Sequence, residues 1–269
     1  MTQTAFYSRR EWFALVGSTN DVVREWLAEG TPEVCLAVAD EQSAGRGREG
    51  RRWVAPAGAA LLVSAGFRPT YLAPDRAWRL AAIGALAMAD AAEEVAGLPE
   101  GTIRLKWPND LVVESDGAGG AVRKLGGILG ESDGLGTSDP RVVVGIGVNA
   151  DWAAAEFPAE LVAEMTSLRE ASGGRPIDRA ALLDAFADRL EPRVSALRDG
   201  RFDAAGWTGR QLTSGRLVRL DRPDGRSEVV RAVGVDPLSG ALLVVAPDRP
   251  GVERAVLTGE IRHLRLAGV

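Results

Sequence analysis

The residues best suited to chemistry lie in one stretch, residues 42–53, which contains three glycines, four arginines and a closing Trp53. Glycine permits close backbone approaches, and arginine offers a planar set of donors that fits carboxylate and phosphate oxygens. The indole adds a flat apolar face suited to an aromatic ring. The pattern predicts a mobile basic loop that closes over an anion. A solvated basic turn is the alternative that this stretch alone leaves open.

The spacing Gly45-x-Gly47-x-x-Gly50 also matches a dinucleotide-binding fingerprint. That fingerprint opens a helix and is followed by an acidic residue about 20 positions further on. Here the chain continues into Trp-Val-Ala-Pro at residues 53–56, which starts no helix, and the expected acidic position holds Thr70. The sequence therefore argues against a Rossmann-type nucleotide site.

A second polar group lies in residues 106–110, where Lys106, Asn109 and Asp110 bring a cation, an amide and a carboxylate to a strand end and its turn. Pro108 restricts the turn and so holds the polar groups that follow it in place. Asp110 is the candidate metal-binding carboxylate of this group. We expect these side chains to face the same ligand as the basic loop.

Three further positions extend the polar set. Lys124 opens a glycine-rich segment, Asn149 ends another, and Ser18, Thr19 and Asn20 stand at an expected helix start. A helix N-terminus also offers unpaired backbone donors, although pure helix capping is the alternative for these three residues. Cationic donors with one carboxylate and no evident nucleophile favour transfer at a phosphoryl group, where catalysis is positioning and charge neutralisation. The chain lacks the glycine-lysine loop of P-loop enzymes.

The composition of the whole chain narrows the class of protein. Its 269 residues are 46% hydrophobic and 26% charged, and the net charge of −5 gives no overall basic field for nucleic acid. The single cysteine, Cys35, lies in an apolar run and is expected in the core, and the single histidine, His263, is expected to be a plain strand residue. No apolar run reaches the ~20 residues of a membrane span, and no signal peptide is evident, so we expect a cytoplasmic protein without a membrane partner.

Apolar periodicity predicts the elements that must position these residues. One helix begins within residues 17–21 and ends at Gly30, and two others cover about 75–96 and 178–197, the last kinked at Pro192. Glycines inside the predicted strands at 124–130 and 142–149 suggest a pocket floor, with tight packing of sheet on helix as the equal alternative. Residues 115–122 are expected to be a loop. Strands are predicted over residues 11–16, 34–39, 60–67, 103–107, 111–113, 124–130 and 142–149.

After about residue 213 the pattern changes to short strands separated by turns. This pattern predicts a small all-β barrel. We therefore expect two domains, a first over residues 1–212, which carries the polar motifs, and a barrel over residues 213–269. The predicted strands of the barrel cover residues 216–220, 228–235, 241–245 and 252–257.

Five ordered motifs give the chain a specific resemblance to the biotin protein ligases, over about residues 10–265. They are Ser-Thr-Asn at 18–20, Gly-Arg-Gly-Arg-x-Gly-Arg at 45–51, Lys-Trp-Pro-Asn-Asp at 106–110, Lys-Leu-Gly-Gly-Ile-Leu at 124–129 and Gly-Ile-Gly-Val-Asn at 145–149. The resemblance implies an α+β fold of the class II synthetase and lipoate-ligase kind. A central mixed or antiparallel sheet with packed helices would precede a small SH3-like β-barrel.

The resemblance also implies a two-step ligase reaction. Biotin and Mg-ATP, both substrates, would form biotinyl-5′-AMP and pyrophosphate. The biotinyl group would then pass to a lysine of a biotin carboxyl carrier protein. No bound prosthetic group is implied, and members of the family can pair as homodimers through the central sheet.

Individual roles carry over from the matching motifs. Lys124, Arg46 and Arg48 are the implied catalytic residues, with Lys124 at the biotin carboxylate and the α-phosphate and the two arginines closing over the adenylate. Biotin binding is implied for Ser18, Thr19, Asn20, Gln42, Arg46, Gly47, Arg48 and Lys124. Nucleotide binding is implied for Gly45, Arg51, Trp53, Lys106, Asn109 and Asn149, and Mg²⁺ binding for Asp110.

Three competing functions are compatible with parts of the chain. A lipoate or octanoate ligase or transferase of the same fold is the nearest, although the basic loop and the motif at 106–110 favour biotin. A non-catalytic binding protein that uses the barrel as its interaction module is the second. A DNA-binding repressor is the third. Relatives that repress transcription carry a helix-turn-helix domain before the ligase, and only 17 residues precede Ser18, so we expect no nucleic-acid partner.

Overall fold

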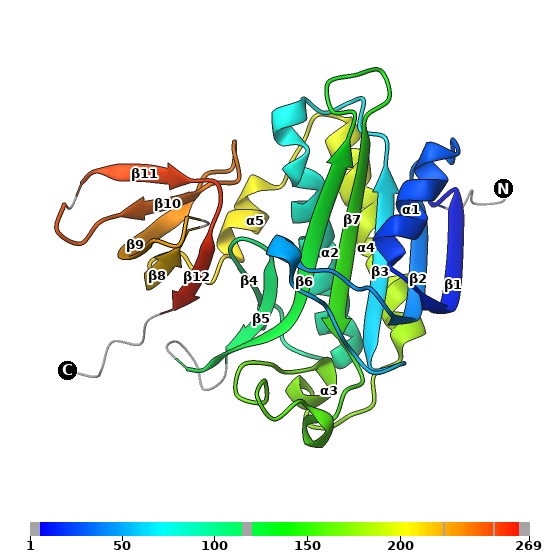
Figure 1. The fold of residues 1–269 in the computed structure, drawn as a ribbon, viewed down its shortest axis with the longest axis horizontal. Helices are drawn as coiled ribbons and strands as arrows, with labels where there is room; N and C mark the ends of the chain where they lie inside the picture. Colours follow the sequence, from blue (N-terminus) through cyan, green and yellow to red (C-terminus); the bar gives the residue numbers. More distant parts are fainter. Residues whose placement is uncertain (1–5, 115–119, 223, 250, 264–269) are drawn as a thin grey trace.

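The computed structural model describes residues 6–114, 120–222, 224–249 and 251–263. These residues form two β-sheets with separate helices and connections (Figure 1). The first sheet has seven strands and carries helices on both faces. The second has five strands and lies beyond the β4 end of the first (Figure 1). The predicted loop at 115–122 lies mostly outside the described residues.

The seven-stranded sheet is mixed, as predicted. β1 and β2 run parallel, whereas the other neighbouring strands are antiparallel. The spatial order is β1-β2-β3-β7-β6-β5-β4. Strand β3 is buried along its whole length because elements cover both faces of the sheet there. The strands are β1 (Arg9–Val16), β2 (Cys35–Gln42), β3 (Ala60–Phe67), β4 (Ile103–Lys106), β5 (Asp110–Glu114), β6 (Val122–Asp133) and β7 (Arg141–Asn149).

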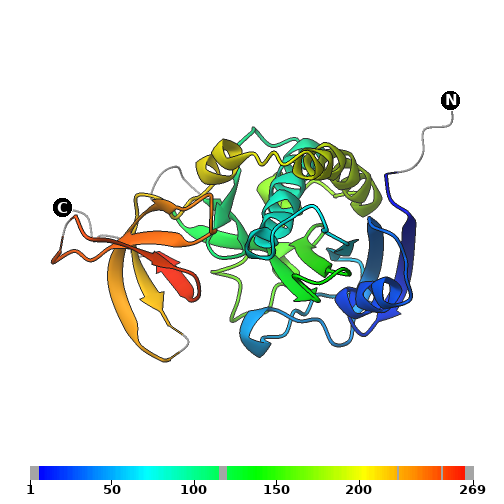
Figure 2. The same cartoon turned by 90° about the horizontal axis from the view of Figure 1, so that it is seen from above.

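Different elements pack on the two faces of this sheet (Figure 2). Helices α2 (Trp78–Ala96) and α4 (Arg179–Arg198) pack against each other on one face, which we call the helix face. Helix α1 (Thr19–Ala28) and the basic loop (residues 45–53) lie on the other, which we call the pocket face. Besides one short helix in the basic loop, four further short helices precede the second sheet in the chain. They are α3 (Leu168–Ala171), α5 (Ala204–Gly209), η2 (Pro74–Arg76) and η3 (Ala154–Glu156).

Helix α2 is buried over most of its circumference because alanines occupy many of its positions. Small side chains let its backbone approach both the sheet and α4. Gly97 ends it with φ of 59°, in the left-handed region that glycine adopts without a steric penalty. In α4, Leu182, Phe186 and Leu190 belong to the buried stripe, which is core as predicted. Pro192 lies inside α4, and the helix continues on both sides of it.

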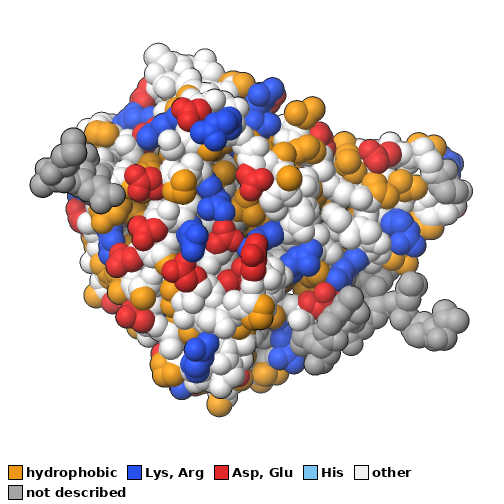
Figure 3. All heavy atoms as spheres, turned by 180° about the vertical axis from the view of Figure 1, so that it is seen from behind, with side chains coloured by type: hydrophobic (Ala, Val, Ile, Leu, Met, Phe, Trp, Pro, Cys, Tyr) orange, Lys and Arg blue, Asp and Glu red, His pale blue; other side chains and the backbone are white. Residues whose placement is uncertain are grey.

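The molecular surface on the side that α2 and α4 cover carries both acidic and basic side chains (Figure 3). Arg189 pairs with Glu94 and Arg193 with Asp90, which tie α4 to α2. Acidic and basic side chains alternate there, so this face presents no single-sign field. Cys35 is fully buried on β2, as predicted, and burial raises the pKa of its thiol to about 11.

The C-terminal sheet is antiparallel with the order β11-β10-β9-β8-β12. It is a separate unit of short strands, which confirms the predicted fold class. His263 belongs to its last strand, where its backbone pairs with Val218. The division at residue 212 stays a prediction, although β8 begins shortly after it. The strands are β8 (Leu217–Asp221), β9 (Ser227–Val235), β10 (Leu242–Val245), β11 (Glu253–Val256) and β12 (Glu260–His263).

Two tryptophans of the catalytic part contact the turn between β9 and β10. The indole N–H of Trp107 donates to the Gly240 carbonyl at 3.2 Å. A β-carbon at Gly240 would lie 2.9 Å from the Trp78 ring, so glycine is needed for this approach. The predicted strand at 103–107 included Trp107. In the structure β4 ends at Lys106, so Trp107 lies just beyond the strand. The contact fixes the C-terminal sheet against the turn that carries Asn109 and Asp110.

Within the described residues, none of the helices is both long and apolar enough to cross a lipid bilayer.

Candidate active site

The floor of the main pocket is a glycine-lined part of β6 and β7. Gly145 lies between Ser64 of β3 and Leu129 of β6, and Gly147 pairs with Gly127. Cross-strand partners point to the same side of a sheet, so the missing side chains leave a hollow on the pocket face. The hollow has a volume of about 130 Å³. The predicted pocket floor is therefore present at Gly127, Gly145 and Gly147.

The glycines make room for side chains that arrive from outside the sheet. A β-carbon at Gly145 would lie 2.2 Å from Asn20 Oδ1, and one at Gly147 would lie 2.7 Å from the Trp53 ring. At Gly126 a β-carbon would lie 2.6 Å from the Gly147 carbonyl oxygen of the neighbouring strand. The close packing at Gly126 is therefore strand against strand, and not the sheet-on-helix packing that was the alternative explanation.

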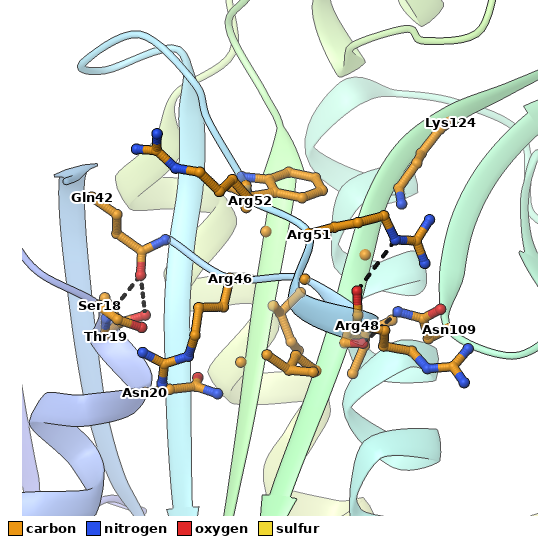
Figure 4. A pocket seen from close by; sticks show the side chains of 18 residues that line it. Ser18, Thr19, Asn20, Gln42, Arg46, Arg48, Arg51, Arg52, Asn109 and Lys124 are labelled. Atoms are coloured by element: carbon orange, nitrogen blue, oxygen red, sulfur yellow. Dashed lines mark hydrogen bonds between the residues drawn. The ribbon is translucent and has the colours of Figure 1, made fainter. Parts of the chain in front are cut away.

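Residues from the start of α1, the end of β2, the basic loop, β6 and the turn before β5 surround this floor (Figure 4). Figure 4 shows Gln42 beside Ser18 and Thr19, and Lys124 and Asn109 on the opposite side of the basic loop. The lining includes five cations and, among the described residues, no carboxylate. The predicted residues that line it are Ser18, Thr19, Asn20, Gln42, Arg46, Gly47, Arg48, Arg51, Trp53, Asn109 and Lys124.

The start of α1 does more than cap a helix. Ser18 is the N-cap residue, yet its side chain makes no capping hydrogen bond and lines the pocket instead. The backbone N–H and the hydroxyl of Thr19 both donate to Gln42 Oε1, at 2.8 and 3.1 Å. Gln42 therefore holds its carboxamide oxygen toward α1 and directs its amide group elsewhere. Pure capping does not account for these three polar residues.

Asn20 is buried and bonded at both ends of its amide. Its Nδ2 donates to Glu131 Oε2 at 2.7 Å, and its Oδ1 accepts from the Ser64 hydroxyl at 2.6 Å. The same hydroxyl lies 2.7 Å from Thr19 Oγ1. The sequence analysis did not identify Ser64 and Glu131, because each stands alone in its strand without a motif around it. Their position on the pocket face is decided by strand pairing.

The basic loop is a small hairpin. Gly47 N–H donates to the Arg51 carbonyl at 2.7 Å, Trp53 N–H donates to the Gly45 carbonyl at 3.0 Å, and the short helix η1 (Arg48–Gly50) forms the tip. Gly45 supports the loop from behind, since a β-carbon there would lie 2.5 Å from the Trp53 carbonyl oxygen. Gly45 thus shapes the loop without lining the pocket.

The basic loop is anchored to other elements near its start and at its tip. Arg46 donates to both Asp21 oxygens, at 2.6 and 2.7 Å, and its Nη2 lies 3.4 Å from Glu131 Oε2. Arg48 Nη1 donates to the Gly259 carbonyl of the C-terminal sheet at 3.3 Å. Hydrogen bonding from Arg46 lowers the pKa of Asp21 below its usual value, and the same pair raises the pKa of Arg46.

Trp53 lies flat against the floor. Its ring is near Gly147 and Gly127, and Lys124 Nζ lies 5.7 Å from the ring centroid. The indole N–H is buried and has no hydrogen-bond partner among the described residues. A buried donor without a partner costs free energy, so a ligand that accepts this hydrogen bond would be favoured here.

Lys124 and Lys106 meet at one carboxylate. Lys124 Nζ lies 2.6 Å from Asp110 Oδ1, and Lys106 Nζ lies 3.6 Å from Asp110 Oδ2. These two are the only lysines of the chain, in which the other 30 basic residues are arginines. Lysine is thus confined to this site, where a compact point charge with rotating donors is placed against an anion. The scarcity of lysine is a feature of the sequence that marks both residues and that the motifs alone do not capture.

A second cavity of about 440 Å³ adjoins the first and extends to the C-terminal sheet. Lys106 and Asp110 line this cavity and not the first, while Arg48 and Asn109 line both. Its far wall consists of Trp78, Trp107 and Trp207 together with residues of the β9–β10 turn, such as Ser239. The two cavities therefore form one hollow region that runs from α1 to the C-terminal sheet.

Asn149 is a predicted site residue that lies outside this lining. It is buried at the end of β7, and its amide donates to the Thr166 carbonyl at 2.9 Å. It belongs to neither cavity wall. That bond ties the end of β7 to the segment before α3, which follows β7 in the chain.

The described residues offer little for a resident metal ion. In this part of the chain no three His, Cys, Asp or Glu side chains gather as a metal-binding group. Asp110, the predicted Mg²⁺ ligand, is paired with two lysines. A single carboxylate suits Mg²⁺ that arrives on nucleotide phosphates, because such ions keep phosphate and water ligands.

Comparison with known proteins identifies the family. The model of the biotin/lipoate A/B protein ligase family matches residues 12–149. A biotin–[acetyl-CoA-carboxylase] ligase of Mycobacterium tuberculosis is 33% identical over 255 residues, which cover 94% of this chain and 88% of the relative. One from Paracoccus denitrificans is 39% identical over 229 residues, covering 82% and 88%.

Solved structures agree with the sequence relatives. The biotin protein ligase from Aquifex aeolicus in complex with biotin and ATP superposes with a TM-score of 0.76 at 25% identity. The match covers 97% of this chain and all of that one. The chain belongs to the biotin/lipoate A/B protein ligase family and, within it, to the biotin protein ligases.

Proposed function

We propose that this protein joins biotin to ATP as biotinyl-5′-AMP and transfers the biotinyl group to a lysine of a biotin carboxyl carrier protein. The observation that carries the proposal is a pocket with two chemically different ends. Thr19, Asn20 and Gln42 supply uncharged hydrogen-bonding groups at one end, whereas Lys124 and Arg51 supply cations at the other. Biotin has the matching pair of ends, a neutral cyclic urea and a carboxylate.

In the first step, a biotin carboxylate oxygen attacks the α-phosphorus of ATP and pyrophosphate leaves. Both reactants are anionic, so the site must neutralise charge before they can approach. Lys124 supports this role because it lines the pocket beside Trp53 and is already paired with a carboxylate, that of Asp110. We propose that the substrate carboxylate and the α-phosphate replace Asp110 as its partners.

The second cavity suits the phosphate end of Mg-ATP. Lys106 and Arg48 supply positive charge there, Asn109 supplies an amide, and Asp110 supplies a carboxylate for the Mg²⁺ that ATP carries. Trp53, with its unpartnered indole N–H, is proposed to lie beside the base. Gly45 and Asn149 would act on the nucleotide indirectly, by shaping the basic loop and the end of β7.

Biotinyl-5′-AMP is a reactive mixed anhydride, so its site must exclude water. The basic loop supports this function because it lies over the pocket and supplies Arg46, Gly47, Arg48, Arg51 and Arg52 to the lining. Closing a loop over an intermediate prevents its hydrolysis and its escape. In the second step, the amine of the carrier lysine attacks the acyl carbon, an amide bond forms, and AMP leaves.

A lipoate or octanoate ligase is the alternative, and the uncharged end of the pocket argues against it. A dithiolane ring or an alkyl chain has no N–H or C=O to pair with Ser18, Thr19, Asn20 and Gln42. Three of these residues are almost fully buried. A site built from hydrogen-bonding groups discriminates against ligands that lack the matching polar atoms, even where those groups, as for Thr19 and Asn20, also bond within the protein.

The decisive experiment compares the three acids in one assay. The protein is incubated with Mg²⁺, ATP and biotin, lipoate or octanoate, and pyrophosphate release is measured. A purified biotin carboxyl carrier domain is then added and weighed by mass spectrometry. We expect pyrophosphate release, and a carrier mass gain of one biotinyl group, with biotin and not with lipoate or octanoate. Binding of biotin without pyrophosphate would instead indicate a non-catalytic binding protein.

The proposal includes a cytoplasmic location, where ATP and carrier proteins are available, and a homodimer. The dimer is supported by β1, the terminal strand of the large sheet, on which Leu15 is 58% exposed and Trp12 is 37% exposed. A second copy that pairs along this strand would cover both side chains. Light scattering of the purified protein, with and without biotin and ATP, tests this state.

A further inference from the structure

We propose that Glu131 is a positioning residue of the ligase site, which fixes the amide of Asn20 and, with Asp21, anchors the Arg46 end of the basic loop. Glu131 does not line the biotin pocket itself. It acts through two residues that do, Asn20 and Arg46. The inference rests on the proposed ligase function and deepens it.

The position of Glu131 follows from strand alternation. On β6, Gly127, Leu129 and Glu131 point to the pocket face, because alternate residues of a strand share a face. Gly127 and Leu129 line the pocket floor, and Glu131 comes next beyond its edge. Its side chain is 27% exposed, so its carboxylate is partly shielded from water. A carboxylate in this place needs positive or hydrogen-bonding partners.

One oxygen of Glu131 receives three donors. Asn20 Nδ2 lies 2.7 Å away, Arg24 Nη2 lies 2.8 Å away, and Arg46 Nη2 lies 3.4 Å away. Asn20 comes from the start of α1 and Arg46 from the basic loop. The carboxylate therefore joins two elements that both contribute to the pocket lining.

The bond to Glu131 decides which way the Asn20 amide faces. A carboxylate only accepts hydrogen bonds, so Nδ2 must face Glu131 and Oδ1 must face the Ser64 hydroxyl. The lack of a side chain at Gly145 gives the amide its space. Without Glu131, the amide could rotate and exchange its donor and acceptor, which would disrupt the uncharged end of the pocket.

The second task of Glu131 is electrostatic. Asp21 and Glu131 supply two negative charges, and Arg24 and Arg46 supply two positive charges, so this cluster is neutral. Arg46 is thus already compensated at one end of the basic loop. At the loop tip, Arg48 donates to the Gly259 carbonyl and lines both cavities. The geometry assigns anchoring of the start of the basic loop to Arg46.

Two substitutions separate the two tasks. Glu131→Gln keeps an oxygen that can accept from Asn20 but removes the charge that pairs with Arg46. Glu131→Ala removes both. Asp133→Asn is the matched control, because Asp133 lies two positions further along the same strand, is exposed, and does not line either cavity. Circular dichroism and thermal melting establish that each variant is folded before it is assayed.

Two measurements distinguish positioning from simple stability. The first is pyrophosphate release against biotin concentration, which gives KM and kcat separately. The second is retention of the intermediate: protein loaded with labelled biotin and ATP is diluted into unlabelled substrates, and retained label is followed by filter binding. We expect Glu131→Ala to raise the biotin KM about tenfold and to speed loss of the intermediate about tenfold, with kcat changed less than about threefold, as for loss of a charge-assisted hydrogen bond.

Glu131→Gln is expected to keep the biotin KM near that of the wild type while it still loses the intermediate faster. Asp133→Asn is expected to match the wild type in both measurements. The proposal is overturned if folded Glu131→Gln and Glu131→Ala both behave like Asp133→Asn. A wild-type protein that releases no pyrophosphate with biotin would instead contradict the proposed function, so the two failures are distinguishable.

Discussion

Lys124 Nζ lies 2.6 Å from Asp110 Oδ1, and this ion pair joins β6 to the start of β5 at the border of the two cavities. The pair holds a cation in the pocket with an anion as its partner. Substrates that bring a carboxylate and phosphates can take the place of that anion. Asp110 thus keeps the Lys124 side chain oriented when no ligand is bound. A substrate anion can replace it when a ligand binds.

The first prediction concerns Lys124→Ala. Removing the ammonium leaves Asp110 with Lys106 at 3.6 Å as its cationic neighbour and leaves the attacking carboxylate unneutralised. We expect pyrophosphate release with biotin to fall by about 100-fold or more, as for loss of one electrostatic contact to a transition state. Biotin binding, measured by isothermal titration calorimetry, should weaken much less, because the ureido end is unchanged.

Arg226→Ala provides the control for that experiment. Arg226 is an exposed arginine in the turn between β8 and β9 that pairs with Asp224 and lines neither cavity. It should release pyrophosphate at the wild-type rate. Normal pyrophosphate release by Lys124→Ala would remove Lys124 from the first step.

A second prediction concerns Arg48→Gly. Arg48 lines both cavities and donates to the Gly259 carbonyl, so glycine removes a cation and the anchor of the loop tip together. We expect the variant still to form biotinyl-5′-AMP but to release it, because the loop no longer closes the site. Bystander proteins rich in lysine should then become biotinylated, which streptavidin blotting measures.

The lysine content of the chain makes that assay clean. The enzyme itself has only Lys106 and Lys124, so it offers few amines to the released intermediate. Labelling restricted to the carrier domain, at the wild-type rate, would contradict the role assigned to the loop tip.

A third prediction concerns Gly147→Ala. The new methyl group would lie 2.7 Å from the Trp53 ring, so the indole must move away from the floor. We expect the KM for ATP to rise about fivefold, since stacking on an aromatic ring contributes roughly 1 kcal/mol. Gly209→Ala is the matched control, because nothing lies within 4 Å of the added atom. An unchanged KM for ATP would show that Trp53 does not bind the base.

A fourth prediction concerns pH and Cys35. Burial raises the thiol pKa to about 11 from its usual value of 9.0, which favours the protonated form in the folded protein. The stability that this provides is complete below pH 9 and is lost as pH rises through 11. A shift of two pKa units corresponds to about 2–3 kcal/mol.

Urea unfolding at pH 8 and pH 10.5, for the wild type and for Cys35→Ala, tests this effect. Other groups titrate in both proteins, so the informative quantity is the difference in unfolding free energy between them. We expect that difference to shrink at the higher pH. An equal difference at both pH values would mean that the Cys35 thiol is not buried as described.

Local patterns in the sequence were sufficient for much of the fold. Alternation and apolar runs predicted the strands of both sheets, because the burial of a strand face is recorded in every second residue. Glycine and alanine content predicted a close-packed α2 and a glycine floor. The short helices α3 and α5 were not predicted, since elements of four and six residues carry too little periodicity.

The sequence by itself determined which polar residue types stand together, because the motifs at 18–20, 45–51, 106–110 and 124–129 each carry their polar groups within a few positions. Only the tertiary structure decided how these motifs combine. It brought Glu131 to Asn20, Gly259 to Arg48, and Asp110 to both lysines, over separations of 111 and 211 residues in the first two cases. Strand pairing and the docking of the C-terminal sheet set these contacts, and no local pattern encodes them.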